Sequence, residues 1–163
     1  MARRIKIGDI IEIKTKKGLF YAQYTHYDEE YGELIQVKKH IYSKRPKNIS
    51  QIVQDENRII AFIPLSFAVN STDIFMVIGN MPIPDKYKPF PVFKCAGYVD
   101  RKGVVKQWKF WDGDNTWPDY WVNELSEDEI SFPRAGIWTY PLLVDRLESD
   151  WTEEKHCLDM MKR

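Results

Sequence analysis

The chain has 163 residues, which is long enough for one domain that buries its own core without a disulfide or a metal ion. Its composition is that of a globular protein, with 44% hydrophobic residues, 29% charged residues and a formal net charge of zero. No apolar run reaches the roughly 20 residues of a membrane-spanning helix, and no apolar segment follows the positive charges of MARRIKIGD. We therefore expect one soluble, cytoplasmic domain over residues 1–163, without a membrane partner.

Cysteine and charge distribution narrow the class further. Cys95 and Cys157 are too few and too far apart for a disulfide scaffold or a zinc cluster, so we expect free thiols, with a single bridge as the alternative. Residues 1–47 carry 11 Lys and Arg against 6 Asp and Glu, whereas residues 112–163 carry 5 against 13. The basic first third and the acidic last third either form two poles of one surface or neutralise each other.

The first forty residues predict three antiparallel strands joined by tight turns. Ile11 and Ile13 alternate with polar residues, and a turn at 16–18 leads into a second strand. One face of that second strand is expected to carry Phe20, Ala22, Tyr24 and His26, and residues 34–38 form the third strand. This pattern predicts a mostly β (α+β) fold, either a strongly bent antiparallel sheet or an SH3-like, partly open barrel.

The middle of the chain continues the β pattern after a polar connector at 43–58, with one helical turn near 49–55. The apolar runs IIAFIPL (59–65) and IFMVIGNMPIP (74–84) predict strands buried on both faces. DKYKPFPVF (85–93), with its prolines, predicts a crossing loop or a sheet edge. Residues 96–114 predict a hairpin turning at 100–103, with Trp108 and Phe110 on one face and Lys109 and Trp111 on the other.

The end of the chain is predicted to be helical. Ser126 and Glu129 have the spacing of a capping box, and Pro133 stops that helix after about one turn. A longer helix is expected from Thr139, with apolar positions at 142, 143, 147 and 151, and another around Cys157. The domain is thus expected to have a β-rich body at 5–125, with a helical segment at 126–163 packed on it.

The sequence contains no catalytic signature, and we expect neither an enzyme nor a bound cofactor or metal ion. The three histidines, His26, His40 and His156, are scattered, and no glycine-rich loop precedes a helix to cradle a phosphate. Asp112-Gly113-Asp114 resembles the opening of a calcium loop, but the later ligands of that motif are missing, so a plain turn is the expectation.

Two surfaces are candidates for a binding partner. One is the stretch WKFWDGDNTWPDYW (108–121), in which Trp111, Asp112, Asp114, Trp117, Asp119 and Trp121 are left after Trp108 and Phe110 are assigned to the core. Exposed aromatic and acidic side chains of this kind suit either a docking protein or a stacked sugar. The other is a basic edge at Lys16, Lys17, Lys38 and Lys39, which with Lys14, Lys44, Arg45 and Lys47 and the tyrosines Tyr21 and Tyr42 would suit nucleic acid, although the zero net charge argues against it.

Several segments, taken in order, resemble the immunity protein 26 family of bacterial polymorphic toxin systems. They are IKIGDIIEIKTKKGLFYAQYTHYD, IIAFIPLSFAV, IFMVIGNMPIP, PFPVFK and WKFWDGD, and together they span roughly residues 5–115. The resemblance implies a mostly β, bacterial, cytoplasmic protein that binds a cognate toxin and blocks it without catalysis. A nucleic-acid-binding β-barrel module and a carbohydrate-binding module remain the alternatives, and the sequence indicates no oligomeric state.

The family supplies no site residues, so the interface is inferred from the residues themselves. An inhibitor of a nuclease can present carboxylates where phosphates would bind, because like-charged groups compete for one basic cleft. We therefore expect the toxin to contact an acidic face with Trp111 or Trp117 as an anchor. That face would contain Asp112, Asp114, Asp119, Glu124, Glu127, Asp128 and Glu129. The basic edge is the second choice.

Overall fold

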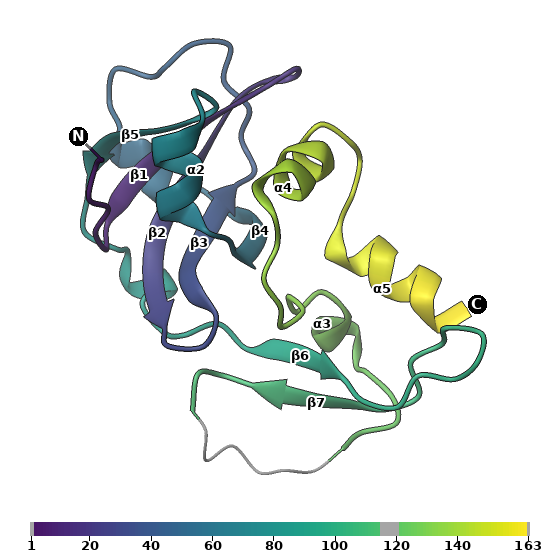
Figure 1. The fold of residues 1–163 in the computed structure, drawn as a ribbon. Helices are drawn as coiled ribbons and strands as arrows, with labels where there is room; N and C mark the ends of the chain where they lie inside the picture. Colours follow the sequence, from purple (N-terminus) through teal and green to yellow (C-terminus); the bar gives the residue numbers. More distant parts are fainter. Residues whose placement is uncertain (1, 115–120, 163) are drawn as a thin grey trace. The chain divides into compact units, whose positions relative to one another are not determined.

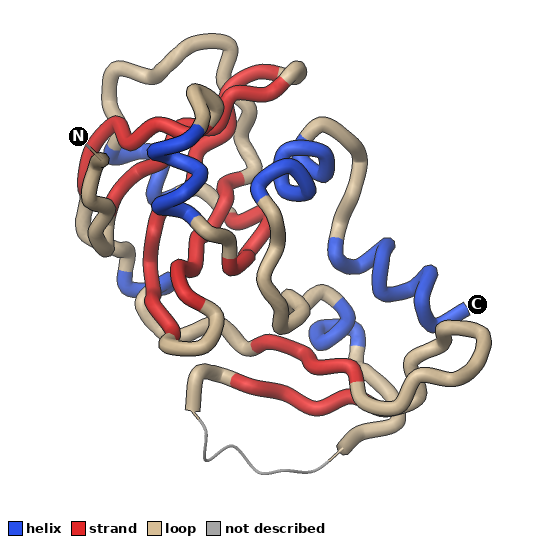
Figure 2. The backbone as a smooth tube through the Cα atoms, in the orientation of Figure 1, coloured by secondary structure: helices blue, strands red, loops and turns tan. Residues whose placement is uncertain are grey.

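A computed structural model describes residues 2–114 and 121–162. The chain divides into two compact units: unit 1 is Met1–Pro89 with Gly136–Asp150, and unit 2 is Phe90–Ala135 with Trp151–Arg163. Both units therefore contain residues from the helical end of the chain (Figure 1). Strands are concentrated in the first unit, and helices are short throughout (Figure 2).

Unit 1 is built on a five-stranded sheet in which every neighbouring pair is antiparallel. Its order is β4-β3-β2-β1-β5, where β1 is Asp9–Thr15, β2 is Gly18–Asp28, β3 is Gly32–Lys38, β4 is Asn57–Phe62 and β5 is Phe75–Asn80. The predicted mostly β, α+β class and the three-stranded meander are confirmed. Since β4 and β5 are the two edges, the sheet formed by the described strands is open.

One face of this sheet is apolar and forms the core of unit 1. The alternation in β1 and β2 places the buried side chains of Ile11, Ile13, Phe20 and Ala22 on this face. Helix α4 (Tyr140–Leu147) contacts β1 and contributes the buried residues Leu143 and Leu147. Thr139 caps this helix as predicted, because its side chain accepts a hydrogen bond from the Leu142 N–H.

A bulge in β2 corrects the predicted placement of His26. Tyr24 pairs with Ile35, but His26 pairs with Leu34, so Thr25 is an extra residue between the two pairs. An inserted residue shifts the alternation by one, and His26 therefore lies on the face opposite to Tyr24. A bulge of this kind bends a strand locally.

Two apolar runs differ from the sequence prediction. The first ends in a helix that was not predicted, α2 (Leu65–Ser71), rather than continuing as a strand. The second forms β5, which was expected to be buried on both faces, but Met76 is 41% exposed. The physical reason is that β5 is an edge strand, so one of its faces is covered less than that of a central strand.

Unit 2 contains a two-stranded antiparallel ribbon, β6 (Phe93–Ala96) and β7 (Trp108–Trp111), with helices α3 (Glu127–Ile130) and α5 (Glu153–Lys162). Trp108 and Phe110 are buried as predicted, and Trp108 packs in one cluster with Cys157 of α5. The capping box of α3 is present in both directions. The turn at Asp100 closes as expected, because the Gly103 N–H donates to its carbonyl oxygen.

The buried cation of Lys94 joins the ribbon to α5 within unit 2. Its side chain is fully buried, and its Nζ lies 3.0 Å from a carboxylate oxygen of Glu153. Nζ also donates to the carbonyl oxygen of Ile130, and Arg134 reaches the same carboxylate at 3.4 Å. A buried charge needs such partners, so this cluster fixes where α5 packs on the ribbon.

Candidate functional site

The structure separates the aromatic stretch at 108–121 into two groups. Trp111, Asp112 and Asp114 lie at one end of β7, whereas Val122, next to Trp121, pairs with Trp108 at the other end. Three residue steps along a strand correspond to about 10 Å. Trp117 and Asp119, the remaining predicted site residues, lie outside the described residues.

Trp121 is an exposed aromatic side chain held in a fixed position. It is 42% exposed, and its ring lies directly on the backbone of Gly97, where an added Cβ would come within 2.4 Å of a ring carbon. The Lys109 Nζ lies 4.8 Å from the ring centroid, a distance at which a cation attracts the π face. Tyr98, the next residue in the sequence, is 62% exposed.

Trp111 lies on the same face of β7 as Lys109, as the strand alternation predicts. Its ring packs edge-on against Phe90, with 5.2 Å between centroids, and also against Phe93. Trp111 is therefore half-buried, and its neighbours Asp112 and Asp114 form a bend in which the Asp114 N–H donates to the carboxylate of Asp112. This is the plain turn that the sequence predicts.

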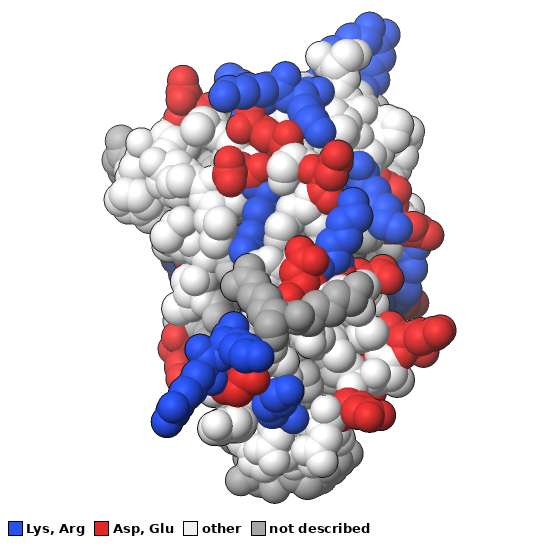
Figure 3. All heavy atoms as spheres, turned by 90° about the vertical axis from the view of Figure 1, so that its right-hand side faces the viewer, with Lys and Arg blue, Asp and Glu red and all other residues white. Residues whose placement is uncertain are grey.

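The rest of the expected acidic face belongs to the region of α3. Glu124, Glu127 and Asp128 are exposed there, whereas the Glu129 carboxylate accepts a hydrogen bond from the Ser126 N–H and closes the capping box. The cation that contacts the Trp121 ring is Lys109, and the turn that follows Gly97 carries the exposed side chains of Arg101, Lys102 and Lys106. Figure 3 shows that Lys and Arg side chains alternate with Asp and Glu on the face that it draws.

Only part of the predicted basic edge is exposed. Lys16, Lys17 and Lys39 lie on the surface, but Lys38 is 1% exposed, which corrects its assignment to that edge. The reason is that Lys38 points to a covered face of the sheet. The surface lysines have acidic neighbours, since the Lys17 Nζ lies 3.9 Å from Asp150 and the Lys39 Nζ lies 2.7 Å from Glu56.

The nucleic-acid alternative loses two of its residues to internal contacts. Tyr21 is fully buried, and its hydroxyl donates to the carboxylate of Glu12 at 2.7 Å. Arg45 donates to both oxygens of the same carboxylate, at 2.7 and 3.0 Å. Burial raises the pKa of Tyr21, and Arg45 holds the pKa of Glu12 below its usual value. Neither the Tyr21 ring nor the Arg45 guanidinium group is thus placed for stacking on bases.

The second face of the sheet in unit 1 carries a buried row of polar side chains. We call it the polar row: Glu12, Tyr21, Gln23, Thr25, Gln36 and Lys38. Residues 39–56 cover one end of it through Ile52 and Val53, which pack on Ile10 and Tyr21. Residues 81–88, which include the single turn η1 (Asp85–Tyr87), also cover the row: Tyr87 lies over Lys38, and the Met81 carbonyl oxygen accepts from Gln23.

A continuous, directed chain of hydrogen bonds links three residues of the polar row with Asn57 and His26. Lys38 Nζ donates to Asn57 Oδ1 at 2.7 Å, Asn57 Nδ2 donates to Gln36 Oε1 at 2.7 Å, and Gln36 Nε2 donates to Thr25 Oγ1 at 3.2 Å. Thr25 Oγ1 lies 2.8 Å from Nδ1 of His26, whose Nε2 lies 2.7 Å from the Lys88 carbonyl oxygen. A carbonyl can only accept, so Nε2 carries the proton and Nδ1 accepts from the threonine hydroxyl.

Two titratable groups end this chain, and burial shifts the pKa of each in the direction that favours its neutral form. Burial lowers the pKa of Lys38 to about 8, although the carboxylate of Asp55 opposes the shift. The Lys38 Nζ also lies 3.8 Å from the centre of the Tyr87 ring. Burial lowers the pKa of His26 as well, while its bond to the Lys88 carbonyl acts in the opposite direction.

Sequence reasoning missed the polar row because its residues alternate with the apolar core residues of β1, β2 and β3. Such alternation normally indicates a half-exposed strand with polar residues in water. The available signal is the length of the connector at 39–56, which carries Ile49, Ile52 and Val53 and so has an apolar side of its own to bury.

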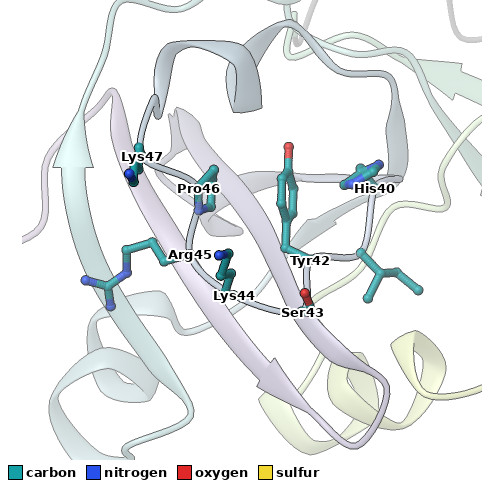
Figure 4. Close-up of a pocket in the computed structure, with 8 residues that line it drawn as sticks. His40, Tyr42, Ser43, Lys44, Arg45, Pro46 and Lys47 are labelled. Atoms are coloured by element: carbon teal, nitrogen blue, oxygen red, sulfur yellow. The ribbon is translucent and has the colours of Figure 1, made fainter.

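The segment of residues 39–49, which we call the strap, crosses the sheet beside this row. Tyr42 forms two backbone hydrogen bonds with Leu19, and its ring packs on those of Tyr21 and His40, at centroid distances of 5.3 and 4.3 Å. Residues 40–47 line a hollow of about 480 Å³, which Figure 4 shows with Arg45 reaching away on the side opposite His40. Its lining contains several cations and no carboxylate.

Residues 2–114 and 121–162 contain no group of three or more His, Cys, Asp or Glu side chains positioned to hold a metal ion. In the same ranges no helix has the length and apolar character to cross a membrane. Cys95 and Cys157 are both free thiols, as predicted.

Comparisons with known proteins give no relative: no protein-family profile, curated protein or solved structure matches this chain.

Proposed function

We propose that the protein is an immunity protein that binds a cognate bacterial toxin in the cytoplasm and blocks it by occlusion. The sequence resemblance to the immunity protein 26 family suggests the class of partner. The observation that carries the proposal is the exposed Trp121, whose ring is held on Gly97 and lies under the Lys109 ammonium group. An exposed tryptophan that is already held in place suits an interface hot spot, because little conformational entropy is lost when it binds.

The finer fold assignment, an SH3-like partly open barrel, is part of the same proposal. Four strands follow one another as a meander, and the fifth returns to pair with β1, so the bent sheet has the order of such a barrel with its two edges left apart.

The test is co-expression and co-purification with the product of the neighbouring toxin gene. Trp121→Ala should weaken binding by about 30-fold, the effect of a hot-spot side chain worth about 2 kcal/mol. The matched control is Phe67→Ala, which removes an aromatic side chain that is 58% exposed on α2 of unit 1. Unchanged binding by the Trp121 variant would show that Trp121 is not an anchor.

The predicted acidic face is tested separately in the same assay. A variant with Asp112, Asp114 and Asp119 all changed to lysine should lose binding and protection if the toxin presents a basic cleft. Retained protection would exclude these three positions. Absence of any complex with either toxin or neighbouring gene product, while the protein remains folded, would refute the immunity function itself.

A further inference from the structure

The strap has the properties of an anion site, and the first of these properties is that it is held in place at two points. It is held at Tyr42 by the N–H and carbonyl bonds to Leu19, of 2.9 and 2.8 Å, and at Arg45 by the two-oxygen contact with Glu12. Glu12 is itself buried and accepts from Tyr21, so the second attachment is fixed to the interior of the sheet. The residues between and beside these two points are therefore positioned before any ligand arrives.

The hollow formed by these residues is electropositive. Lys44 and Lys47 lie in its lining, both exposed, and neither forms an ion pair with any of the described residues. Lys14 adds a third exposed cation beside Glu12, on the same face of β1. Among the described residues, the carboxylate that pairs with Arg45 is that of Glu12, which lies beneath the strap rather than in the lining, and the Asp55 carboxylate accepts from the His40 N–H.

The lining also supplies neutral groups that suit a phosphoryl ligand. Ser43 has an exposed side chain with a hydroxyl that can donate to a phosphoryl oxygen. His40 is exposed, and its ring meets that of Tyr42 at an interplanar angle of 65°, so one ring presents its edge to the other. Figure 4 shows this aromatic pair at one side of the strap and Lys47 at the other, with Ser43 below Tyr42 and Lys44 between Tyr42 and Lys47.

We propose that the strap binds a phosphate-bearing ligand, with Lys44, Lys47 and the Ser43 hydroxyl contacting the phosphoryl oxygens. Ammonium groups on flexible stems neutralise phosphate as point charges, and a hydroxyl adds a directed hydrogen bond. The volume of about 480 Å³ accommodates a nucleotide as well as free phosphate. This site lies in unit 1, on residues separate from those around Trp121 in unit 2, so it is independent of the proposed toxin surface.

The experiment measures binding of inorganic phosphate, ATP and a 12-nucleotide single-stranded DNA to the whole chain by NMR titration at about 50 mM salt. We expect phosphate and ATP to shift the amide signals of residues 40–47, and the Lys44→Ala, Lys47→Ala double variant to bind each about tenfold more weakly. The charge-matched control, Arg101→Ala with Lys102→Ala, changes two exposed cations of unit 2 and should leave the affinity unchanged.

The three probes identify the source of the phosphate. Equal affinity for phosphate and ATP indicates a phosphoryl site alone, whereas tighter ATP binding that is lost in His40→Ala indicates that the aromatic pair contacts a base. DNA binding that falls with the double variant assigns the site to nucleic-acid backbone. No shift with any probe, or equal binding by the wild type and the strap double variant, would overturn the proposal.

Discussion

The protein should become more stable as the pH rises from 7 to 9, because the buried ammonium group of Lys38 loses its proton in the folded chain. The pKa of Lys38 is about 8 in the folded chain and has the ordinary value of 10.5 in the unfolded chain. Below pH 8 the group is charged in both states, so folding carries the full cost of burying the charge. Above pH 8 the folded chain releases the proton first, and that cost is progressively relieved until the unfolded chain also deprotonates near pH 10.5.

The size of the effect follows from the two pKa values. Each pKa unit corresponds to about 1.4 kcal/mol, so the whole difference amounts to about 3 kcal/mol, of which about 1 kcal/mol is gained between pH 7 and pH 9. The gain in stability should not continue far above pH 9, because burial raises the pKa of Tyr24 to about 12. Unfolded tyrosines ionise near pH 10, and this favours unfolding at higher pH.

The assay is urea unfolding at pH 7, 8 and 9 for the wild type and for Lys38→Met, which keeps the side-chain length but removes the charge. Groups common to both proteins cancel, so the wild type should gain about 1 kcal/mol relative to the variant across this range. Lys39→Met is the control, because Lys39 is exposed on the neighbouring position and its variant should retain the wild-type gain. Parallel pH profiles of wild type and Lys38→Met would refute the reasoning.

Three further outcomes are expected from single substitutions. Glu12→Gln should cost about 1–2 kcal/mol of unfolding free energy at pH 7. The variant and the wild type should converge in acid, because the stability that the lowered pKa of Glu12 contributes is lost as the pH falls through that pKa. A constant difference in unfolding free energy down to pH 3 would contradict this. Glu153→Gln should cost about 3 kcal/mol in urea unfolding by leaving the buried Lys94 with too few partners, and a loss below 0.5 kcal/mol would show that the pair is dispensable. Gly97→Ala should displace the Trp121 ring, seen as a red-shifted tryptophan emission, and an unchanged emission would contradict the contact between Gly97 and this ring.

The sequence predicts those parts of the fold in which local pattern and burial agree. Strand alternation assigns Trp108 and Phe110 to the interior, and the spacing of Ser126 and Glu129 gives the capping box, because both depend only on neighbouring residues. The placement of His26 fails because a bulge at Thr25 is a property of the pairing with β3, which no single strand encodes.

The candidate sites depend even more on distant residues. Nothing near Lys38 in the chain indicates that Tyr87, almost fifty positions later, covers its ammonium group. Likewise, Trp121 is placed by contact with Gly97, so its separation from Trp111 follows from the ribbon rather than from the ten-residue spacing in the sequence. The sequence shows which residues are aromatic or charged, but the pairing of the strands and the segments packed over the sheet determine which of these residues can face a partner.

The two units alternate along the chain, and this order constrains how the protein folds while it is being synthesised. The chain passes between units after residues 89, 135 and 150, and α4, which supplies Leu143 and Leu147 to the core of unit 1, is translated only after most of unit 2. A nascent chain on the ribosome can therefore pair its five strands early, but it keeps an apolar sheet face uncovered until about residue 150 has emerged from the exit tunnel. Ribosome-bound chains that end before α4 should engage chaperones, and chains released after it should not.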